Sequence, residues 1–230
     1  MNKRAVVSFS NQKGRYVQNM ARLSDSLRNN FTTGEFIGFI NEESLGCPKH
    51  SEQPYGFKIF CFENVVQRGF TSVLYLDSSV FAVGNIDNLF DEIEQDGFIA
   101  QQAGHLCSTW SNDHTLNHFG ITRDEAEKMP MIGNAGFLGL DFTKPIANQF
   151  FRMWKEAYLN DCFKGAWNND TLTESIDERC KGARHDMASS SIIFNKLGMI
   201  EKAKPGDEIL QYGGIYSANI NSTIILKAEG

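Results

Sequence analysis

The sequence predicts an α/β fold with a mainly parallel central sheet flanked by helices, and three observations support this prediction. Short apolar runs alternate with segments of helical periodicity through the first hundred residues, which is the order of a β-α-β succession. The run from Ser72 to Leu76 is short, apolar and bounded by polar residues, as expected of a strand covered on both faces. The chain has 230 residues with 41% hydrophobic and 22% charged content, which suits a single globular domain spanning 1–230.

Strands and helices follow one another in the first half. Apolar side chains recur every three or four residues from Tyr16 to Leu27, which predicts an amphipathic helix after the first strand. Gly69 can end a short helix over 63–68, and Asn85 can cap the next helix. The predicted strands are residues 4–10, 36–40, 57–62, 72–76 and 98–101.

The second half is less regular. Residues 105–131 are polar and broken, and we expect them to form a surface excursion rather than a core element. A strand is predicted over 134–141, and its glycines are typical of a close approach by a ligand or another backbone. A helix follows with Pro145 in its first turn, and another begins after Arg184. Between them, 161–184 is predicted to be irregular, and the tail from Tyr212 is predicted to form a loop and a final strand.

Composition and charge exclude several classes of protein. The formal net charge of −6 argues against a broad basic surface for nucleic acid. The five cysteines are widely spaced without a C-x-x-C pair, which argues against a disulfide framework or a structural zinc site. No segment approaches the length of a membrane span, and the first apolar run is too short for a signal peptide. We therefore expect a soluble protein of the cytoplasm.

The residues directly after the 72–76 strand are the first candidates for a site. Asp77, Ser78 and Ser79 follow the strand, and ligands of open α/β sheets bind just beyond the carboxyl ends of such strands. A carboxylate there suits a divalent cation that bridges to a diphosphate. The alternative is an Asx-type turn in which Asp77 only caps backbone N–H groups.

Three blocks of the chain resemble the GT-A-fold glycosyltransferases. The blocks are the strand and helix around Asp77, the strand Asn134-Ala-Gly-Phe-Leu-Gly-Leu, and the segment that begins Arg184-His-Asp. Their order and spacing carry the resemblance, which covers most of the chain from Arg4 to about Gly198. It implies a nucleotide-sugar-binding half at about 1–100 and an acceptor half at about 101–230.

The resemblance also implies a reaction and a set of residues. The reaction is transfer of a sugar from a nucleoside-diphosphate donor to an acceptor hydroxyl, with Mn²⁺ or Mg²⁺ held by Asp77 and Ser79. The catalytic carboxylate is expected to be Asp186. The residues expected to bind substrate are Ser8, Asn11, Arg15, Arg68, Asp77, Ser78, Ser79, Asn134, Ala135, Gly136 and His185.

The chain departs from the family pattern at Ser79, where the family has a second acidic residue. A hydroxyl is a poorer ligand for Mg²⁺ or Mn²⁺ than a carboxylate. Three outcomes remain open: a metal held by Asp77 with waters and phosphates, a metal-free site, or a non-catalytic relative. In the metal-free site, Lys13, Arg15 and Arg68 would neutralise the diphosphate.

Each candidate also has a structural interpretation. Asp186 can serve as a helix N-cap, and His185 and Arg15 can be ordinary structural or solvated residues. Trp167 can stack on an acceptor or pin a loop to the core.

Two other functions compete with glycosyl transfer. One is a non-catalytic nucleotide- or carbohydrate-binding module. The other is a sugar-phosphate nucleotidyltransferase, which is disfavoured because the first loop lacks the glycine-rich, Arg-containing signature of those enzymes.

Overall fold

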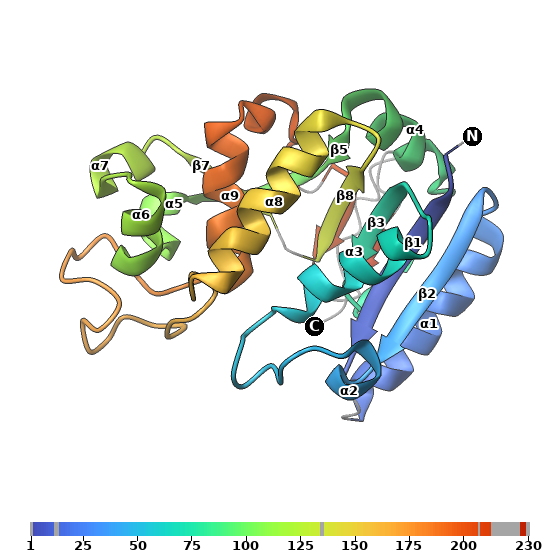
Figure 1. Cartoon of the computed structure of the whole chain (residues 1–230), viewed down its shortest axis with the longest axis horizontal. Helices are drawn as coiled ribbons and strands as arrows, with labels where there is room; N and C mark the ends of the chain where they lie inside the picture. The colour runs from blue at the N-terminus through green and yellow to red at the C-terminus, as the bar shows by residue number, and fades with distance from the viewer. Residues whose placement is uncertain (1, 12–13, 134–135, 207, 213–225, 229–230) are drawn as a thin grey trace.

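A five-stranded mixed sheet forms the centre of the molecule in the computed structural model (Figure 1), which describes residues 2–11, 14–133, 136–206, 208–212 and 226–228. Its strand order is β2-β1-β3-β8-β5, and β1 is parallel to both of its neighbours. β8 is antiparallel to both β3 and β5. The strands are β1 (Arg4–Ser10), β2 (Gly34–Ile40), β3 (Ser72–Leu76), β5 (Phe98–Ile99) and β8 (Phe137–Asp141). The α/β class is confirmed, but the sheet is mixed because β8 enters between two strands of the opposite direction.

Helices cover both faces of this sheet. Along β3, Val73 and Tyr75 belong to one apolar cluster, whereas Leu74 and Leu76 belong to another. This alternation is the two-residue period of a strand buried on both sides. The first cluster is completed by α3 (Phe57–Gln67), α8 (Pro145–Leu159) and α9 (His185–Lys196), and the second by α1 (Arg15–Asn30) and α4 (Asp87–Asp96).

The strand predicted over 57–62 is wrong, because these residues form the first half of α3. The first half of the helix is almost entirely apolar, and Phe57, Ile59 and Phe62 are buried. A run of six residues that are nearly all apolar shows neither a helical nor a strand period, so it can be interpreted equally well as a buried strand. The helix predicted over 63–68 is the continuation of α3, which ends at Gln67.

The segment 105–131 is not a surface excursion, so this prediction is also wrong. It forms three short helices and part of a two-stranded ribbon, which lie beside α9 on the side of the molecule away from β2 (Figure 1). Its core contains Cys107, Leu116 and Met131, together with Ala188 and Ile192 of α9. The elements are β6 (Gln101–Leu106), α5 (Cys107–Trp110), α6 (Asp113–Phe119), α7 (Arg123–Ala126) and β7 (Pro130–Gly133). Its core forms with a helix that is distant in the sequence, so the local pattern alone is not apolar enough to reveal it.

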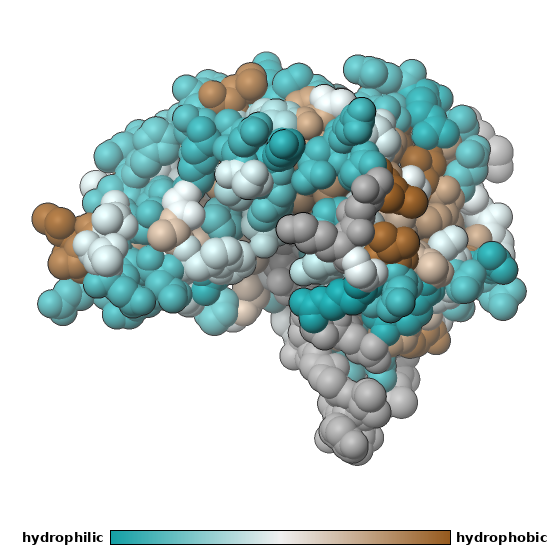
Figure 2. All heavy atoms as spheres, turned by 90° about the horizontal axis from the view of Figure 1, so that it is seen from below, coloured by the Kyte–Doolittle hydropathy of each residue, from teal (hydrophilic) through white to brown (hydrophobic). Residues whose placement is uncertain are grey.

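Three further predictions concern α8, the segment 161–184 and the tail, of which residues 213–225 lie outside the described residues. Pro145 lies in the first turn of α8, and 161–184 contains no helix or strand. The last described residues form a strand, and it pairs with two other short strands. These smaller elements are α2 (Glu42–Leu45), η1 (Met199–Lys202), β4 (Val80–Ala82), β9 (Leu210–Tyr212) and β10 (Leu226–Ala228). Figure 2 shows a mainly hydrophilic surface on the face seen from below.

Candidate functional site

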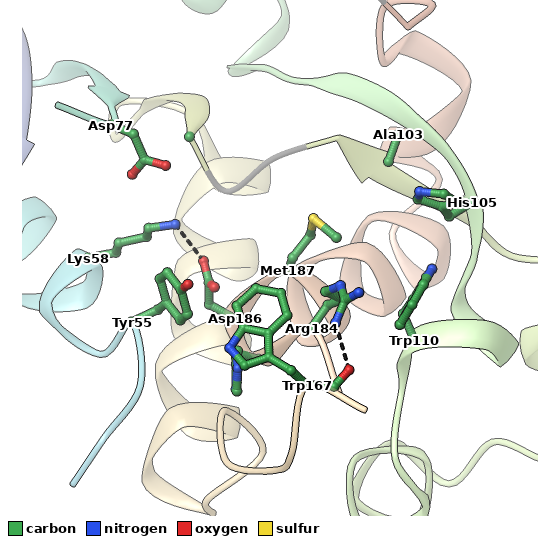
Figure 3. Close-up of a pocket in the computed structure, with 12 residues that line it drawn as sticks. Tyr55, Lys58, Asp77, Ala103, His105, Trp110, Trp167, Arg184, Asp186 and Met187 are labelled. Carbon is green, nitrogen blue, oxygen red and sulfur yellow. Dashed lines mark hydrogen bonds and ion pairs between the residues drawn. The ribbon is translucent and has the colours of Figure 1, made fainter. Parts of the chain in front are cut away.

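Two adjoining pockets lie where β1 and β3 end, and they share Tyr55 and Asp77. The larger, here the Asp186 pocket, has a volume of about 320 Å³ (Figure 3). The smaller, here the Asn11 pocket, has a volume of about 260 Å³. Lining the Asp186 pocket are Lys58, His105, Trp110, Trp167, Arg184 and Asp186, among others. Lining the Asn11 pocket are Ser10, Asn11, Tyr16, His50, Phe57 and Ser79, among others.

Asp77 stands at the junction of the two pockets because it directly follows β3. Its backbone N–H donates to the carbonyl of Gly136 at 3.0 Å. Its Oδ1 accepts a hydrogen bond from the hydroxyl of Tyr75 at 2.8 Å, and Tyr75 is itself buried in the sheet. A carboxylate fixed in this way faces both pockets without needing to reorient.

Lys58 and Asp186 form a buried ion pair at the base of the Asp186 pocket (Figure 3). The distance from Nζ to Oδ2 is 2.9 Å, and the two side chains are 1% and 3% exposed. Burial raises the pKa of the Asp186 carboxyl, and the neighbouring Lys58 ammonium opposes this rise. The indole of Trp154 also donates to the backbone carbonyl of Asp186 at 3.2 Å. The pair therefore places two opposite, oriented charges against the pocket.

The sequence prediction missed Lys58 because it assigned these residues to a strand. A signal was nevertheless present. Lys58 is the one charged residue within the run Phe57-Lys-Ile-Phe-Cys-Phe, and a lysine buried in apolar surroundings requires a partner of opposite charge. The sequence does not reveal that the partner lies on α9.

Tyr55 and His185 pack against each other in the lining of the Asp186 pocket, and both have unusual backbone conformations. Their φ angles are 58° and 47°, in the left-handed region that costs a non-glycine residue about 1–2 kcal/mol. The two rings lie 5.3 Å apart between centroids. His185 Nδ1 lies 2.9 Å from the carbonyl oxygen of Phe163, and a carbonyl only accepts, so Nδ1 carries the proton. Burial lowers the pKa of His185, which favours the neutral ring.

The outer wall of the Asp186 pocket is an arginine between two tryptophans (Figure 3). The guanidinium carbon of Arg184 lies 3.6 Å from the ring centroid of Trp110 and 4.4 Å from that of Trp167. Arg184 Nη1 donates to the backbone carbonyl of Trp167 at 2.9 Å. Trp167 is 51% exposed, so one ring of this stack faces the solvent at the pocket mouth.

Aromatic rings and small polar groups line the Asn11 pocket. Phe9 and Phe57 stack with centroids 4.2 Å apart, and His50 meets Tyr55 edge-on at 4.7 Å. Asn11 Oδ1 is buried and has no hydrogen-bond partner among the described residues. A flat, aromatic ligand with a polar edge would therefore find both stacking surfaces and an unused acceptor here.

The structure brings together most of the predicted site residues that it describes. Asn11, Asp77, Ser78 and Ser79 line the Asn11 pocket, and Asp77, Gly136, His185 and Asp186 line the Asp186 pocket. Lys13, Asn134 and Ala135 lie outside the described residues.

Three predicted residues do not line either pocket. Ser8 is fully buried within β1, one residue before Phe9, where the lining of the Asn11 pocket begins. Arg15 is exposed at the start of α1, where its guanidinium lies 5.3 Å from the Tyr16 ring. Arg68 caps the end of α3 opposite Lys58 and lies over Phe70. Arg68 is therefore not among the residues that line the two pockets, and its role as a ligand stays a prediction.

The described residues offer a sparse set of metal ligands. Within 2–11, 14–133, 136–206, 208–212 and 226–228, no group of three or more His, Cys, Asp and Glu residues could hold a metal ion. Asp77 and the Ser79 hydroxyl fit only a cation that arrives with phosphate oxygens, as Mg²⁺ commonly does. Arg22 Nη2 donates to the carbonyl of Ser79 at 3.0 Å, which places a positive charge beside the residue that departs from the family pattern.

No protein-family model matches the chain, and neither does any curated protein. Among the helices that the structure describes, none is long and apolar enough to cross a membrane. The function must therefore be argued from the two pockets themselves.

Proposed function

We propose that this protein is a glycosyltransferase of the GT-A fold that moves a sugar from a nucleoside-diphosphate donor to an acceptor hydroxyl. The observation that carries the proposal is the meeting of two pockets at Asp77, with the Lys58–Asp186 pair directly beside the junction. A transferase needs two neighbouring sites, one for the donor and one for the acceptor. It also needs charged groups at the point where the bond to the donor breaks and the bond to the acceptor forms.

The Asn11 pocket suits the nucleotide. It lies at the carboxyl ends of parallel strands, where α/β proteins bind nucleotides. Its aromatic walls can stack on a base, which is worth about 1–3 kcal/mol per base. The unpaired Oδ1 of Asn11 can accept a hydrogen bond from an exocyclic amine, a ring N–H or a ribose hydroxyl. The diphosphate then extends toward Asp77 and Ser79.

The negative charge of the diphosphate must be offset at this point. A Mn²⁺ or Mg²⁺ ion held by Asp77 and Ser79 would supply that charge when bound. Arg22 contacts Ser79 through its guanidinium, and Lys58 lines the Asp186 pocket together with Asp77. Arg15 lies at the start of α1. A metal-free route would depend on such cations instead.

The transfer itself takes place where the two pockets join. The acceptor oxygen forms a bond to the anomeric carbon, the bond from that carbon to the diphosphate oxygen breaks with its electron pair, and the proton of the acceptor hydroxyl passes to the leaving diphosphate. Asp186 is the proposed catalytic carboxylate, since Lys58 holds its charge and orientation against the pocket. Its negative charge can stabilise the positive charge that develops on the sugar ring. Lys58 is well placed to donate to an oxygen of the sugar or the leaving diphosphate.

One observation favours a second candidate, a non-catalytic nucleotide- or carbohydrate-binding module. Ser79 replaces an acidic residue, and the part of the chain that the structure describes contains no three-ligand metal group. Such a module would bind a nucleotide sugar in the same pockets without breaking it.

A thermal-shift screen with a donor hydrolysis assay tests both candidates. UDP-, GDP-, ADP- and dTDP-sugars are compared with Mn²⁺, with Mg²⁺ and with a chelator. A donor at a hundredfold excess over its Kd stabilises the native state by about 2.7 kcal/mol, which raises the Tm by roughly 5–10 °C in a chain of this size. Asp77→Asn should remove the shift. The control Asp25→Asn changes an exposed carboxylate on α1 and should retain it.

The outcomes separate the hypotheses. One donor that raises the Tm and is slowly hydrolysed supports the transferase. A donor that binds but is neither hydrolysed nor used for transfer supports the binding module. No shift with any donor contradicts both proposals.

A further inference from the structure

Arg184 is a cation of the Asp186 pocket that has no carboxylate partner among the described residues. Lys58 is paired with Asp186, and Asp77 accepts from Tyr75. Among the described residues, the guanidinium of Arg184 makes no ion pair, and the one hydrogen bond of this side chain is donated to the carbonyl of Trp167. Burial lowers the pKa of Arg184, although the guanidinium stays charged at any physiological pH.

The two tryptophans fix the orientation of this charge. Trp110 and Trp167 cover its guanidinium at 3.6 Å and 4.4 Å from their ring centroids. When aromatic rings cover both faces of a guanidinium, only its edge is accessible to a ligand, and its N–H donors lie along that edge. Stacked arginines of this kind are held in place before a ligand arrives, so little side-chain entropy is lost on binding.

A second unused donor lies beside it. Trp110 Nε1 is buried and has no hydrogen-bond partner among the described residues. His105 meets the same ring edge-on, 6.0 Å away between centroids, and also lines the pocket. This wall therefore presents a fixed positive charge and an N–H donor, and it lies across the pocket from Lys58 and Asp77 (Figure 3).

We propose that this wall binds an acidic group of the acceptor, a carboxylate or a phosphate, and so selects an anionic acceptor. The proposal rests on the proposed function, because it assigns the Asp186 pocket to the acceptor. Carboxylates and phosphates match the fork of N–H donors on arginine. The acceptor hydroxyl would then point toward Asp77 and Asp186, while the acidic group lies against Arg184.

Binding of matched sugars tests the proposal independently of turnover. Isothermal titration at low salt compares methyl β-D-glucuronide with methyl β-D-glucoside, and glucose 6-phosphate with glucose. One acidic member is expected to bind about tenfold more tightly than its neutral partner, the ratio typical of one hydrogen-bonded charge. The pair that shows the preference identifies the acidic group as a carboxylate or a phosphate.

Three variants assign the effect. Arg184→Gln should reduce the preference to less than twofold, and Arg184→Lys should retain part of it. Arg152→Gln is the matched control, because it removes an equal charge from an exposed position on α8 outside the pocket lining. Thermal melting of each variant reports whether the fold is retained. Equal binding of acidic and neutral sugars by the native protein overturns the proposal, as does failure of both acidic sugars to bind or an undiminished preference in Arg184→Gln.

The failure of this proposal can be told apart from that of the proposed function. If nucleotide sugars bind and are hydrolysed but acidic sugars show no preference, the acceptor assignment alone is wrong. If the preference depends on Arg184 but no nucleotide sugar binds, the anion site stands and the transferase does not.

Discussion

Replacing Lys58 with Met should destabilise the protein by about 3–5 kcal/mol at neutral pH, because it leaves a buried carboxylate without its partner. The two charged atoms are 2.9 Å apart, and the side chains are 1% and 3% exposed. At that distance and an effective dielectric constant of about 20, their attraction is about 6 kcal/mol. The expected loss of Tm is roughly 6–20 °C for a chain of this size.

The structure provides a matched control for this variant. Lys164 and Asp161 form an ion pair with the same separation of 2.9 Å, but their side chains are 47% and 52% exposed. Lys164→Met should therefore cost no more than about 1 kcal/mol. Both variants are measured by denaturant unfolding, with the free energy of unfolding taken from the transition midpoint and slope.

The pH dependence adds an independent check. Burial already raises the pKa of Asp186 in the native protein, and removal of the ammonium raises it further. The folded Lys58→Met variant therefore binds a proton more readily than its unfolded chain, so its stability falls as pH rises through that folded pKa. The cost of the substitution should be smaller at pH 5 than at pH 8. A cost at pH 8 no greater than that of Lys164→Met would refute the reasoning.

Three further predictions concern the pocket walls. Tyr75→Phe removes the hydrogen bond to Asp77 and should weaken nucleotide-sugar binding about tenfold, measured by titration. Gly182→Ala places a methyl group against the backbone carbonyl of Trp167, and should lower stability by about 1–3 kcal/mol in a denaturant titration. His185 has a pKa below its ordinary value of 6.5, so stability should fall as pH falls below about 6.5. His185→Gln should reduce that slope, and an unchanged slope would contradict the argument.

The sequence was sufficient to predict the elements whose pattern is local. The three- and four-residue spacing in α1 separates a buried face from an exposed one, and the short apolar run of β3 reflects a strand that is buried along its whole length. Asp77 could be predicted for a related reason, since it directly follows a strand that is covered on both sides. The position of a residue at a strand end requires no knowledge of the rest of the chain.

The features that could not be predicted depend on contacts between distant segments. The first half of α3 is almost entirely apolar, so its sequence lacks the polar positions that would distinguish it from a strand. The helices α5–α7 bury their apolar residues against α9, which begins more than fifty residues later. Gly139 illustrates the same limit. The absence of a side chain at Gly139 leaves room for the side chain of Ile93 on α4 and not for a ligand.

We expect the buried Lys58–Asp186 pair to contribute more to the proposed reaction than to the stability of the fold. Lys58 lies in the first turn of α3, where the helix dipole disfavours a positive charge, and burying both groups carries a large desolvation cost. Apolar residues of similar volume often replace such pairs with little loss or even a gain of stability. The double variant Lys58→Met/Asp186→Leu should therefore be more stable than Lys58→Met alone, and close to the native protein in Tm. If the pair acts on the sugar as proposed, this well-folded double variant should still bind the nucleotide but lose donor hydrolysis and transfer. Full activity in a folded double variant would make the pair structural and remove Asp186 from the mechanism.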